Sequence, residues 1–366
     1  MKRLLICILA LLMMLPLASC TTDDEPPSNT SESTASTEGV GTTGNNEEES
    51  PQDPSKVLDL YLVAGQSNAA GSTKISSTAE IFEFAPELKY GFSKVLYSGT
   101  IPTPGAPRVI NWKKTTYGLG RTSEHMGPEA GMAKAFSAYY NKETGRTAGI
   151  VKYALGGTSI RNWSSANWVP PSYQSQLPAS SVTEATGALY RGFLEQVEKS
   201  VSDAAKLGYT SVRICGLYWM QGCADRAEPN LYQEIFFCFV RDVRKDVSKI
   251  MKRYTNSDDD CGASDMPIIV GTISQTYDLS SATAEQTNIK FIAMQKRFED
   301  IIRNCYVVDN SGYKVSEWKN GQIVVLGSDK YHWKQADALE IGENVGKAML
   351  YCAGVTTEDP FPNRAN

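Results

Sequence analysis

Ser67 lies in a Gly-Gln-Ser-Asn block, directly after an apolar, strand-like run at 57–63. Far downstream, Asp329 and His332 place a carboxylate and an imidazole three positions apart. The chain contains only 2 histidines, so the choice of a base is narrow. A serine hydroxyl becomes a nucleophile when a base accepts its proton and an acid orients that base. These three residues therefore predict ester hydrolysis, provided that the fold brings the two segments together.

The second histidine, His125, is the alternative base. It precedes a Met-Gly-Pro sequence in a loop-like stretch and has no acid at the spacing that separates Asp329 from His332. A general base needs a partner that fixes its tautomer. We therefore expect His125 to lie in solvent or at the rim of the pocket.

Two further polar blocks follow strand-like runs. Gly156 and Gly157 come after the run at 148–155, and Gln221 comes after the run at 212–219. Glycines allow backbone N–H groups to approach a developing oxyanion, although they also serve simple tight turns. The amide of Gln221 could donate to the same oxyanion or cap a loop. Because ligands bind at the carboxyl ends of parallel strands, we expect these blocks to meet Ser67 there.

The pattern along the chain predicts an α/β fold. Strands are predicted at 57–63, 148–155, 212–219 and 267–273, with a weaker one at 323–326, and helices are predicted at 128–140, 183–207, 232–253, 284–303 and 335–351. Continuous apolar strands that alternate with amphipathic helices indicate a parallel sheet covered on both faces. The stretches 72–123 and 159–182 fit neither period, and we expect them to wall the substrate pocket.

In the order of these blocks the chain resembles the SGNH hydrolases, specifically the carbohydrate-esterase branch that contains sialate O-acetylesterases and acetylxylan esterases. The matching blocks are 65–68, 127–129, 156–159, 219–225 and 329–332, and the resemblance covers about residues 57–352. It implies a three-layer α/β/α sandwich of flavodoxin-like type with a central parallel sheet.

The resemblance also implies roles for single residues. Ser67 would be the nucleophile, His332 the base and Asp329 its orienting partner. The N–H groups of Ser67 and of Gly156 or Gly157, with the Gln221 side chain, would form the oxyanion hole. Substrate contacts are expected from six further residues: Gln66, Asn68, Arg161, Trp163, Asp225 and Trp333.

One residue departs from the family pattern. Cys223 stands where the branch usually has a Glu after the Gln-Gly pair. A thiol supplies neither the charge nor the two acceptor oxygens of a carboxylate. Exported proteins can form disulfides, so Cys223 is either a bridged or a free thiol at this stage. We expect the change to affect fine geometry and substrate preference more than activity itself.

The amino-terminal residues read as an export signal. Two basic residues precede an apolar stretch at 4–17, and the Leu-Ala-Ser-Cys sequence that ends at Cys20 resembles a bacterial lipobox. We therefore expect residues 1–20 to be a lipoprotein signal peptide, residues 21–55 an acidic, Ser/Thr-rich tether, residues 56–355 the esterase domain and residues 356–366 a tail. The expected location is the cell envelope, with the lipid in the outer membrane. Acidic residues at 23–25 fit either display on the outer surface or a solvated tether.

The composition narrows the partners. The net charge of −5 argues against nucleic acid, because no basic stripe is available to neutralise phosphates. No cysteine or histidine spacing typical of zinc sites occurs, and the predicted chemistry requires neither a metal nor a cofactor.

The sequence therefore predicts a lipid-anchored serine esterase that removes acetyl groups from a carbohydrate. Two alternatives remain: an esterase or lipase that acts on non-carbohydrate esters, and a non-catalytic glycan-binding lipoprotein that keeps the esterase scaffold. The substitution at Cys223 favours the last alternative, whereas the intact Ser67, Asp329 and His332 argue against it.

Overall fold

The computed structural model describes residues 53–103, 105–164 and 187–361. The expected signal peptide, nearly all of the expected tether and the last residues of the expected tail lie outside the described residues. The segment 165–186 also lies outside them. It includes part of the loop that we expected to wall the pocket and the beginning of the helix expected at 183–207.

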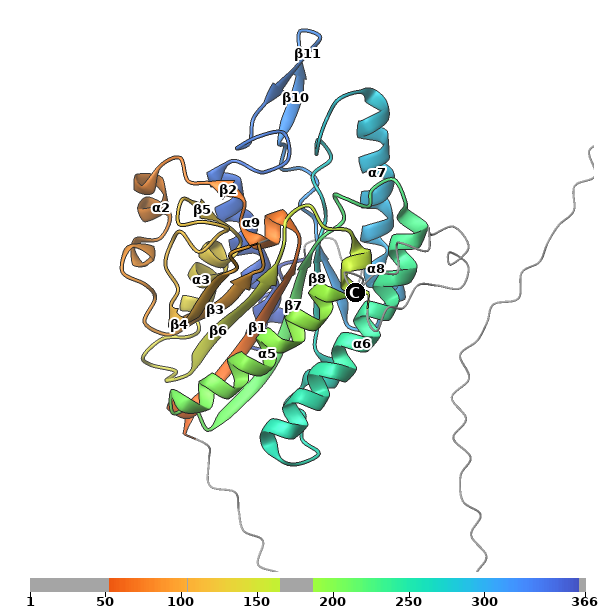
Figure 1. Cartoon of the computed structure of the whole chain (residues 1–366). Helices are drawn as coiled ribbons and strands as arrows, with labels where there is room; N and C mark the ends of the chain where they lie inside the picture. Colours follow the sequence, from red (N-terminus) through yellow and green to blue (C-terminus); the bar gives the residue numbers. More distant parts are fainter. Residues whose placement is uncertain (1–52, 104, 165–186, 362–366) are drawn as a thin grey trace, which may run out of the picture. The chain divides into compact units, whose positions relative to one another are not determined.

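A central sheet of seven strands runs through the described residues in the order β4-β3-β6-β1-β7-β8-β9 (Figure 1). The strands are β1 (Val57–Gly65), β3 (Val95–Ile101), β4 (Arg108–Lys114), β6 (Thr147–Ala154), β7 (Ser211–Met220), β8 (Ile268–Gly271) and β9 (Cys305–Val308). Neighbouring strands are parallel except at one edge, where β4 is antiparallel to β3. The succession β6-β1-β7-β8-β9 gives the 2-1-3-4-5 order of flavodoxin-like folds.

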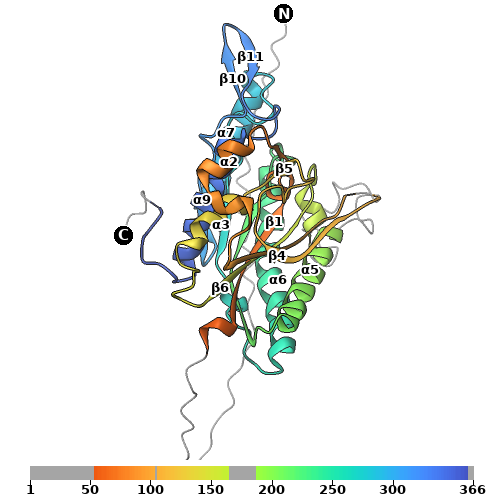
Figure 2. The ribbon, with the colours of Figure 1, turned by 90° about the vertical axis from the view of Figure 1, so that its left-hand side faces the viewer.

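Helices cover both faces of this sheet, so the predicted three-layer α/β/α fold is confirmed. Figure 2 shows α3 and α9 on one side of the strands and α5 and α6 on the other. The helices are α1 (Ser67–Ala70), α2 (Thr78–Phe84), α3 (Glu129–Ser137), α5 (Ala188–Lys206), α6 (Pro229–Thr255), α7 (Ala282–Lys296), α8 (Phe298–Ile301) and α9 (Gln335–Cys352). No described helix is both long and apolar enough to cross a membrane.

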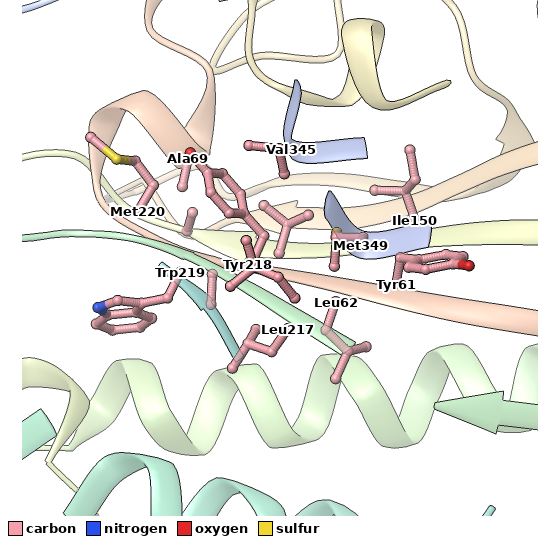
Figure 3. Close-up of a cluster of buried hydrophobic side chains, with 14 of the residues drawn as sticks. Tyr61, Leu62, Ala69, Ile150, Leu217, Tyr218, Trp219, Met220, Val345 and Met349 are labelled. Carbon is pink, nitrogen blue, oxygen red and sulfur yellow. The ribbon is translucent and has the colours of Figure 1, made fainter. Parts of the chain in front are cut away.

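The core lies between the sheet and its helices. Every residue of β1 and β6 is buried, as expected for central parallel strands. Successive side chains of a strand point to opposite faces, so Tyr61 reaches the side of α9 while Leu62 reaches the other side (Figure 3). On the α9 side, Val345 and Met349 of the helix pack close to these strands.

The structure differs from the predicted elements in several places, and strand β9 was not predicted. The stretch 72–123 contains two strands of the sheet, β3 and the edge strand β4, whose mixed composition hides the period of 2. The weak strand at 323–326 belongs to a separate hairpin of β10 (Ser316–Lys319) and β11 (Gln322–Val325) instead of the main sheet. The helix predicted at 284–303 is two helices, α7 and α8, which meet at Arg297.

Candidate active site

A pocket of about 410 Å³ opens at the carboxyl ends of the central strands. Its lining residues come from segments far apart in the sequence: Ser67, Ala70, Ser72, Ile101, Thr103, Arg121, Leu155, Gly156, Gly157, Tyr277, Tyr331 and His332. Ligand pockets commonly enclose about 300–1,000 Å³. The fold therefore brings the Ser67 block, the two glycines and the His332 block to one cavity, as the sequence predicted.

The chain reaches Ser67 through a sharp change of direction after β1. Gly65 has a φ of +137°, and a Cβ at this position would lie 2.1 Å from the carbonyl oxygen of Met220 in the neighbouring strand. Only glycine fits such a position. Ser67 then begins the short helix α1, which ends at Gly71 in the left-handed conformation (φ +86°). These two glycines fix the place of the serine at the end of the strand.

Asp329 makes three hydrogen bonds, two with His332 and one with Tyr331. Asp329 Oδ2 lies 2.8 Å from His332 Nδ1, and Asp329 Oδ1 accepts from the backbone N–H groups of Tyr331 (2.7 Å) and His332 (3.0 Å). Partial burial acts to raise the pKa of Asp329, but these hydrogen bonds outweigh it and hold the pKa below its usual value. The carboxylate is therefore ionised at neutral pH and can only accept hydrogen bonds.

The Ser67 side chain makes no hydrogen bond within the described part of the chain, and it faces the pocket that His332 also lines. No direct hydrogen bond joins Ser67 Oγ to the imidazole. Catalytic hydrogen bonds are often long before substrate binds.

Backbone N–H groups are available beside the serine. A Cβ at Gly156 would lie only 3.1 Å from Ser67 Cβ, so the missing side chain lets this backbone stand against the serine. Among the backbone hydrogen bonds of the described loops, none is donated by Gly156 or Gly157. Ser67 is the first residue of α1, and its N–H has no partner inside the helix. Three N–H groups around the pocket are thus free to bind an oxyanion.

Comparison with known families identifies the chain. Residues 57–351 match the family model described as carbohydrate esterase, sialic acid-specific acetylesterase. The chain belongs to this family.

Several solved structures are similar to the chain at low sequence identity. NanS is 14% identical, with a TM-score of 0.50, and the match covers 82% of this chain and 99% of NanS. A protein from Arabidopsis thaliana is 17% identical over 80% of this chain and 97% of that chain, with a TM-score of 0.46. A carbohydrate acetylesterase from Xanthomonas citri is 14% identical over 82% of this chain and 57% of that chain, also with a TM-score of 0.46. No curated protein sequence matches the chain.

In this member of the acetylesterase family, the side-chain amide of Gln221 already donates hydrogen bonds within the protein. Its Nε2 donates to the carbonyl of Thr158 (3.0 Å) and to Asp225 Oδ2 (2.5 Å), and Gln221 does not line the pocket. This geometry is against the predicted oxyanion role of the side chain. Asp225 also accepts from Ser159 Oγ and from the N–H of Ile160 (2.9 Å). Through these hydrogen bonds Asp225 joins the loops that follow β6 and β7. Asp225 is buried and does not line the pocket, so the structure does not support its predicted substrate contact.

Three more residues that we expected to contact the substrate are buried and do not line the pocket. Gln66 is buried, and its Oε1 accepts from the N–H groups of Gly222 (3.2 Å) and Ala224 (3.4 Å). Asn68 and Trp333 face a separate void of about 10 Å³, which has room for little more than one water molecule. Gln66, Asn68 and Trp333 do not line the pocket, so the structure does not support the predicted substrate contact.

The expected contacts Trp163 and Arg161 also lie outside the pocket. Trp163 is fully buried and packs edge to face against Trp219, with ring centroids 5.1 Å apart. Its ring therefore belongs to the core and cannot stack on a sugar. Arg161 pairs with Glu228 at 3.0 Å. Both residues lie in the 3₁₀ turn at Ile160–Trp163, which contacts α5 and α6.

His125 is in the short strand β5 (His125–Met126), which pairs with β2 (Thr73–Lys74) beside the site. Its Nδ1 lies 2.7 Å from Thr122 Oγ1, and no carboxylate of the described residues forms a hydrogen bond with its ring. Burial and then the charge of nearby Arg121 lower the pKa of His125. His125 does not line the pocket, so the alternative base is not supported.

The stretch 72–123 forms part of the pocket wall, as predicted, but the individual residues of the wall were not identified from the sequence. Thr103 and Arg121 lie in the stretch that fitted neither period, and they face the pocket from the β3 side. Tyr277 and Tyr331 form the opposite wall, with ring centroids 5.6 Å apart. Tyr331 precedes His332, so its place beside the predicted base was the one available signal.

A buried ion pair lies beneath the site. Lys152 Nζ donates to Glu129 Oε2 (2.9 Å) and to the carbonyls of Ala70 (3.2 Å) and Leu119 (3.1 Å), which satisfies all three donors of the ammonium group. Both charged side chains are fully buried. Burial lowers the pKa of Lys152, although the Glu129 carboxylate opposes this effect. Lys152 thus holds the end of α1 in place.

Cys223 is a buried free thiol in the structure. Burial raises its pKa to about 12, so the thiol stays neutral. Arg226 donates to the Cys223 carbonyl (2.8 Å) and pairs with Asp278 (2.9 Å), which orders the loop without the carboxylate that the family usually places here. Among the described residues, no group of three or more metal-ligating side chains occurs.

Proposed function

We propose that this chain is a serine carboxylesterase that removes O-acetyl groups from a carbohydrate through an acyl-enzyme. Membership of the acetylesterase family supports carbohydrate esterase chemistry. The observation that carries the proposal is that Ser67 and His332 line one pocket while Asp329 holds the imidazole.

The protonation states follow from the Asp329 carboxylate. Because this ionised group only accepts hydrogen bonds, His332 Nδ1 must carry the proton that they share. In the neutral imidazole, His332 Nε2 then carries no proton and can act as the base towards the pocket. The acid fixes the tautomer in which the imidazole can accept the proton of Ser67.

The reaction then has two stages. Ser67 Oγ attacks the acetyl carbonyl while His332 Nε2 takes the hydroxyl proton, and the oxyanion accepts hydrogen bonds from the N–H groups of Ser67 and Gly156 or Gly157. The proton passes from His332 to the sugar oxygen, and the deacetylated sugar leaves. Water, activated by the same imidazole, attacks the acetyl-serine and releases acetate. The sum is an ester plus water giving an alcohol plus acetic acid.

The walls of the pocket fit a sugar ester. The rings of Tyr277 and Tyr331 offer flat apolar surfaces with polar edges, which suit the C–H face of a sugar ring. Ser72, Thr103 and Arg121 supply polar groups on the other side.

The test is acetate release from acetylated xylan, acetylated pectin and O-acetylated sialyllactose, with p-nitrophenyl acetate and octanoate as small esters. We expect acetate from at least one glycan and slow cleavage of the octanoate. Preference for the octanoate without release from any glycan would indicate a lipase. Binding of a glycan without any hydrolysis would indicate the non-catalytic alternative. A fluorophosphonate probe should add its mass to Ser67 and should label a His332→Ala variant far more slowly.

We also propose that acyl chains on Cys20 attach the esterase to the outer membrane. The lipobox-like sequence supports this, since two or more acyl chains give stable attachment without a spanning helix. A Cys20→Ser variant should move from the membrane fraction to the soluble fraction. Unchanged fractionation would mean that something other than this lipid attaches the protein.

A further inference from the structure

The hairpin of β10 and β11 stands apart from the sheet and its helices. Figures 1 and 2 both show it projecting beyond the body of the domain, past the end of the sheet where the pocket opens. Its strands pair only with each other. An isolated two-stranded hairpin is only marginally stable in water. A hairpin that projects in this way therefore indicates a role other than stabilising the fold.

One face of this hairpin is apolar. Trp318 pairs directly with Ile323, and Ser316 pairs with Val325, so these four side chains share a face. Trp318 is 47% exposed and Val325 is 50% exposed. The opposite face carries Glu317, Lys319, Gln322 and Val324. We call Trp318, Ile323 and Val325 the hairpin face.

The base of the hairpin and the pocket wall are joined by hydrogen bonds. Thr276 Oγ1 accepts from the N–H groups of Val315 (3.0 Å) and Ser316 (3.3 Å), where β10 begins. Two residues further on, the N–H of Asp278 donates to the carbonyl of Lys330 (2.9 Å). One loop therefore holds the hairpin on one side and the segment of Tyr331 and His332 on the other.

The tyrosine wall of the pocket lies within this same connection. Tyr277 sits between the two anchoring residues of the loop, and its ring packs against Tyr331. The chain also runs from the end of β11 directly into Asp329 and His332. The hairpin that carries Trp318 is thus joined to the tyrosine wall of the pocket through this loop.

We propose that the hairpin face binds the carbohydrate chain beyond the acetylated sugar, so that Trp318 stacks on a sugar outside the pocket. This proposal rests on the proposed function and adds that the substrate is an oligosaccharide or polysaccharide. Tryptophan offers a broad apolar face with one N–H donor at its edge, which matches the C–H face and hydroxyl rim of a sugar.

A protein partner fits this surface less well. A stable protein interface buries about 800 Å² on each side, with some 20–30 residues. The hairpin face offers only three apolar side chains, a size that suits one or two sugar rings. The loop at 276–278 joins the hairpin to the tyrosine wall of the pocket. This connection is a second reason to place one substrate on the hairpin face and in the pocket.

The experiment compares Trp318→Ala with the parent enzyme on acetylated xylan, acetylated pectin, O-acetylated sialyllactose and p-nitrophenyl acetate. We expect kcat/KM on the preferred glycan to fall about tenfold, mainly through KM, because a central aromatic contact is lost. Hydrolysis of p-nitrophenyl acetate should not change, because this ester occupies the pocket alone. Trp318→Phe should keep most of the glycan activity. Lys319→Ala, on the opposite face of the same strand, is the matched control and should leave both substrates unaffected.

Three outcomes would overturn the proposal. Unchanged kcat/KM on every glycan would show that the hairpin face makes no substrate contact. An equal loss on p-nitrophenyl acetate would show that the hairpin only supports the His332 segment. A Trp318-dependent dimer in sedimentation would assign the face to a second copy and also overturn it.

Binding to the same three glycans by the Ser67→Ala variant keeps this test separate from the proposed function. The inference expects about tenfold weaker binding when Trp318→Ala is added, whether or not the parent enzyme releases acetate. If the parent enzyme is inactive and Trp318 still governs binding, the proposed hydrolysis fails while the glycan surface stands.

Discussion

Strand β1 carries Asp59 near its amino end, and just past its carboxyl end the chain carries Ser67. Asp59 is fully buried, and its carboxylate accepts from Arg213 Nε (2.7 Å), from Tyr140 OH (2.9 Å) and from Arg146. Ser67 Oγ has no partner in the described part of the chain and faces a pocket. Near the amino end of β1, the Asp59 carboxylate has all its hydrogen-bond partners. Past the carboxyl end, the Ser67 hydroxyl has none among the described residues.

This contrast separates stability from function. A saturated buried carboxylate stabilises the fold only through its partners and has no capacity left for a ligand. An unsatisfied hydroxyl in a pocket adds nothing to stability and is open to a substrate. Changes at the two ends of β1 should therefore affect different measurements.

The largest effect is expected at the carboxyl end. Ser67→Ala should lower kcat by about 10⁴-fold or more, because it removes the nucleophile. The melting temperature should stay the same, since Ser67 Oγ makes no hydrogen bond in the described structure. The measurements are p-nitrophenyl acetate hydrolysis and thermal unfolding of the same preparation. A variant that keeps most of its activity would remove Ser67 from the mechanism.

The next effect concerns the ion pair beneath the site. Lys152→Met leaves Glu129 buried without its cation and should lower the free energy of unfolding by about 3–5 kcal/mol. The double variant with Glu129→Gln should lose clearly less, because no charge remains buried. Lys134→Met is the control, since its pair with Glu343 is partly exposed and should be worth less than about 1 kcal/mol. Additive losses in urea unfolding would show that the two side chains act independently.

A smaller effect is expected at the amino end of β1. Asp59→Asn should lower the free energy of unfolding by about 2 kcal/mol, because Arg213 and Arg146 lose their carboxylate but can reach water. Catalysis should be unaffected in the fraction that is folded. Asp203→Asn, which removes only exposed ion pairs, should change stability by less than about 1 kcal/mol. A large fall in kcat for Asp59→Asn at full folding would break the separation proposed above.

The smallest effect is a pH dependence at Asp329. The folded pKa of Asp329 lies below its unfolded value, so its stabilising contribution is present above the unfolded pKa and disappears as pH falls through the folded one. The difference in unfolding free energy between the parent and Asp329→Asn should therefore be constant between about pH 5 and 7 and close below about pH 4. A difference that widens on acidification would mean that the hydrogen bonds of Asp329 have been assigned wrongly.

The sequence predicted the blocks of the site because they are local. Gly156 and Ser67 each follow an apolar strand, and parallel strands end at one edge, so their meeting follows from pattern alone. Asp329 and His332 are close enough in the chain to bond within one loop. These parts of the fold and the site needed no knowledge of distant contacts.

The directions of the side chains could not be predicted in this way. Gln66 and Asp225 turn inward because Gly222, Ser159 and other distant groups offer them partners. Trp163 turns into an aromatic core that is assembled from β7, α5 and α6. Such choices depend on which groups tertiary packing supplies, and a polar or aromatic residue beside a motif looks the same in either case.

The contacts of Lys152 indicate at which stage of folding the active site forms. Its partners Ala70, Leu119 and Glu129 lie 82, 33 and 23 positions away in the chain. An ammonium group buried before its partners arrive is costly, so these contacts should form together and late. The helix that carries Ser67 is therefore held in place only when β6, α3 and the loop at Leu119 have come together. During refolding, esterase activity should return with the last phase, which makes hydrolysis a reporter of the finished fold.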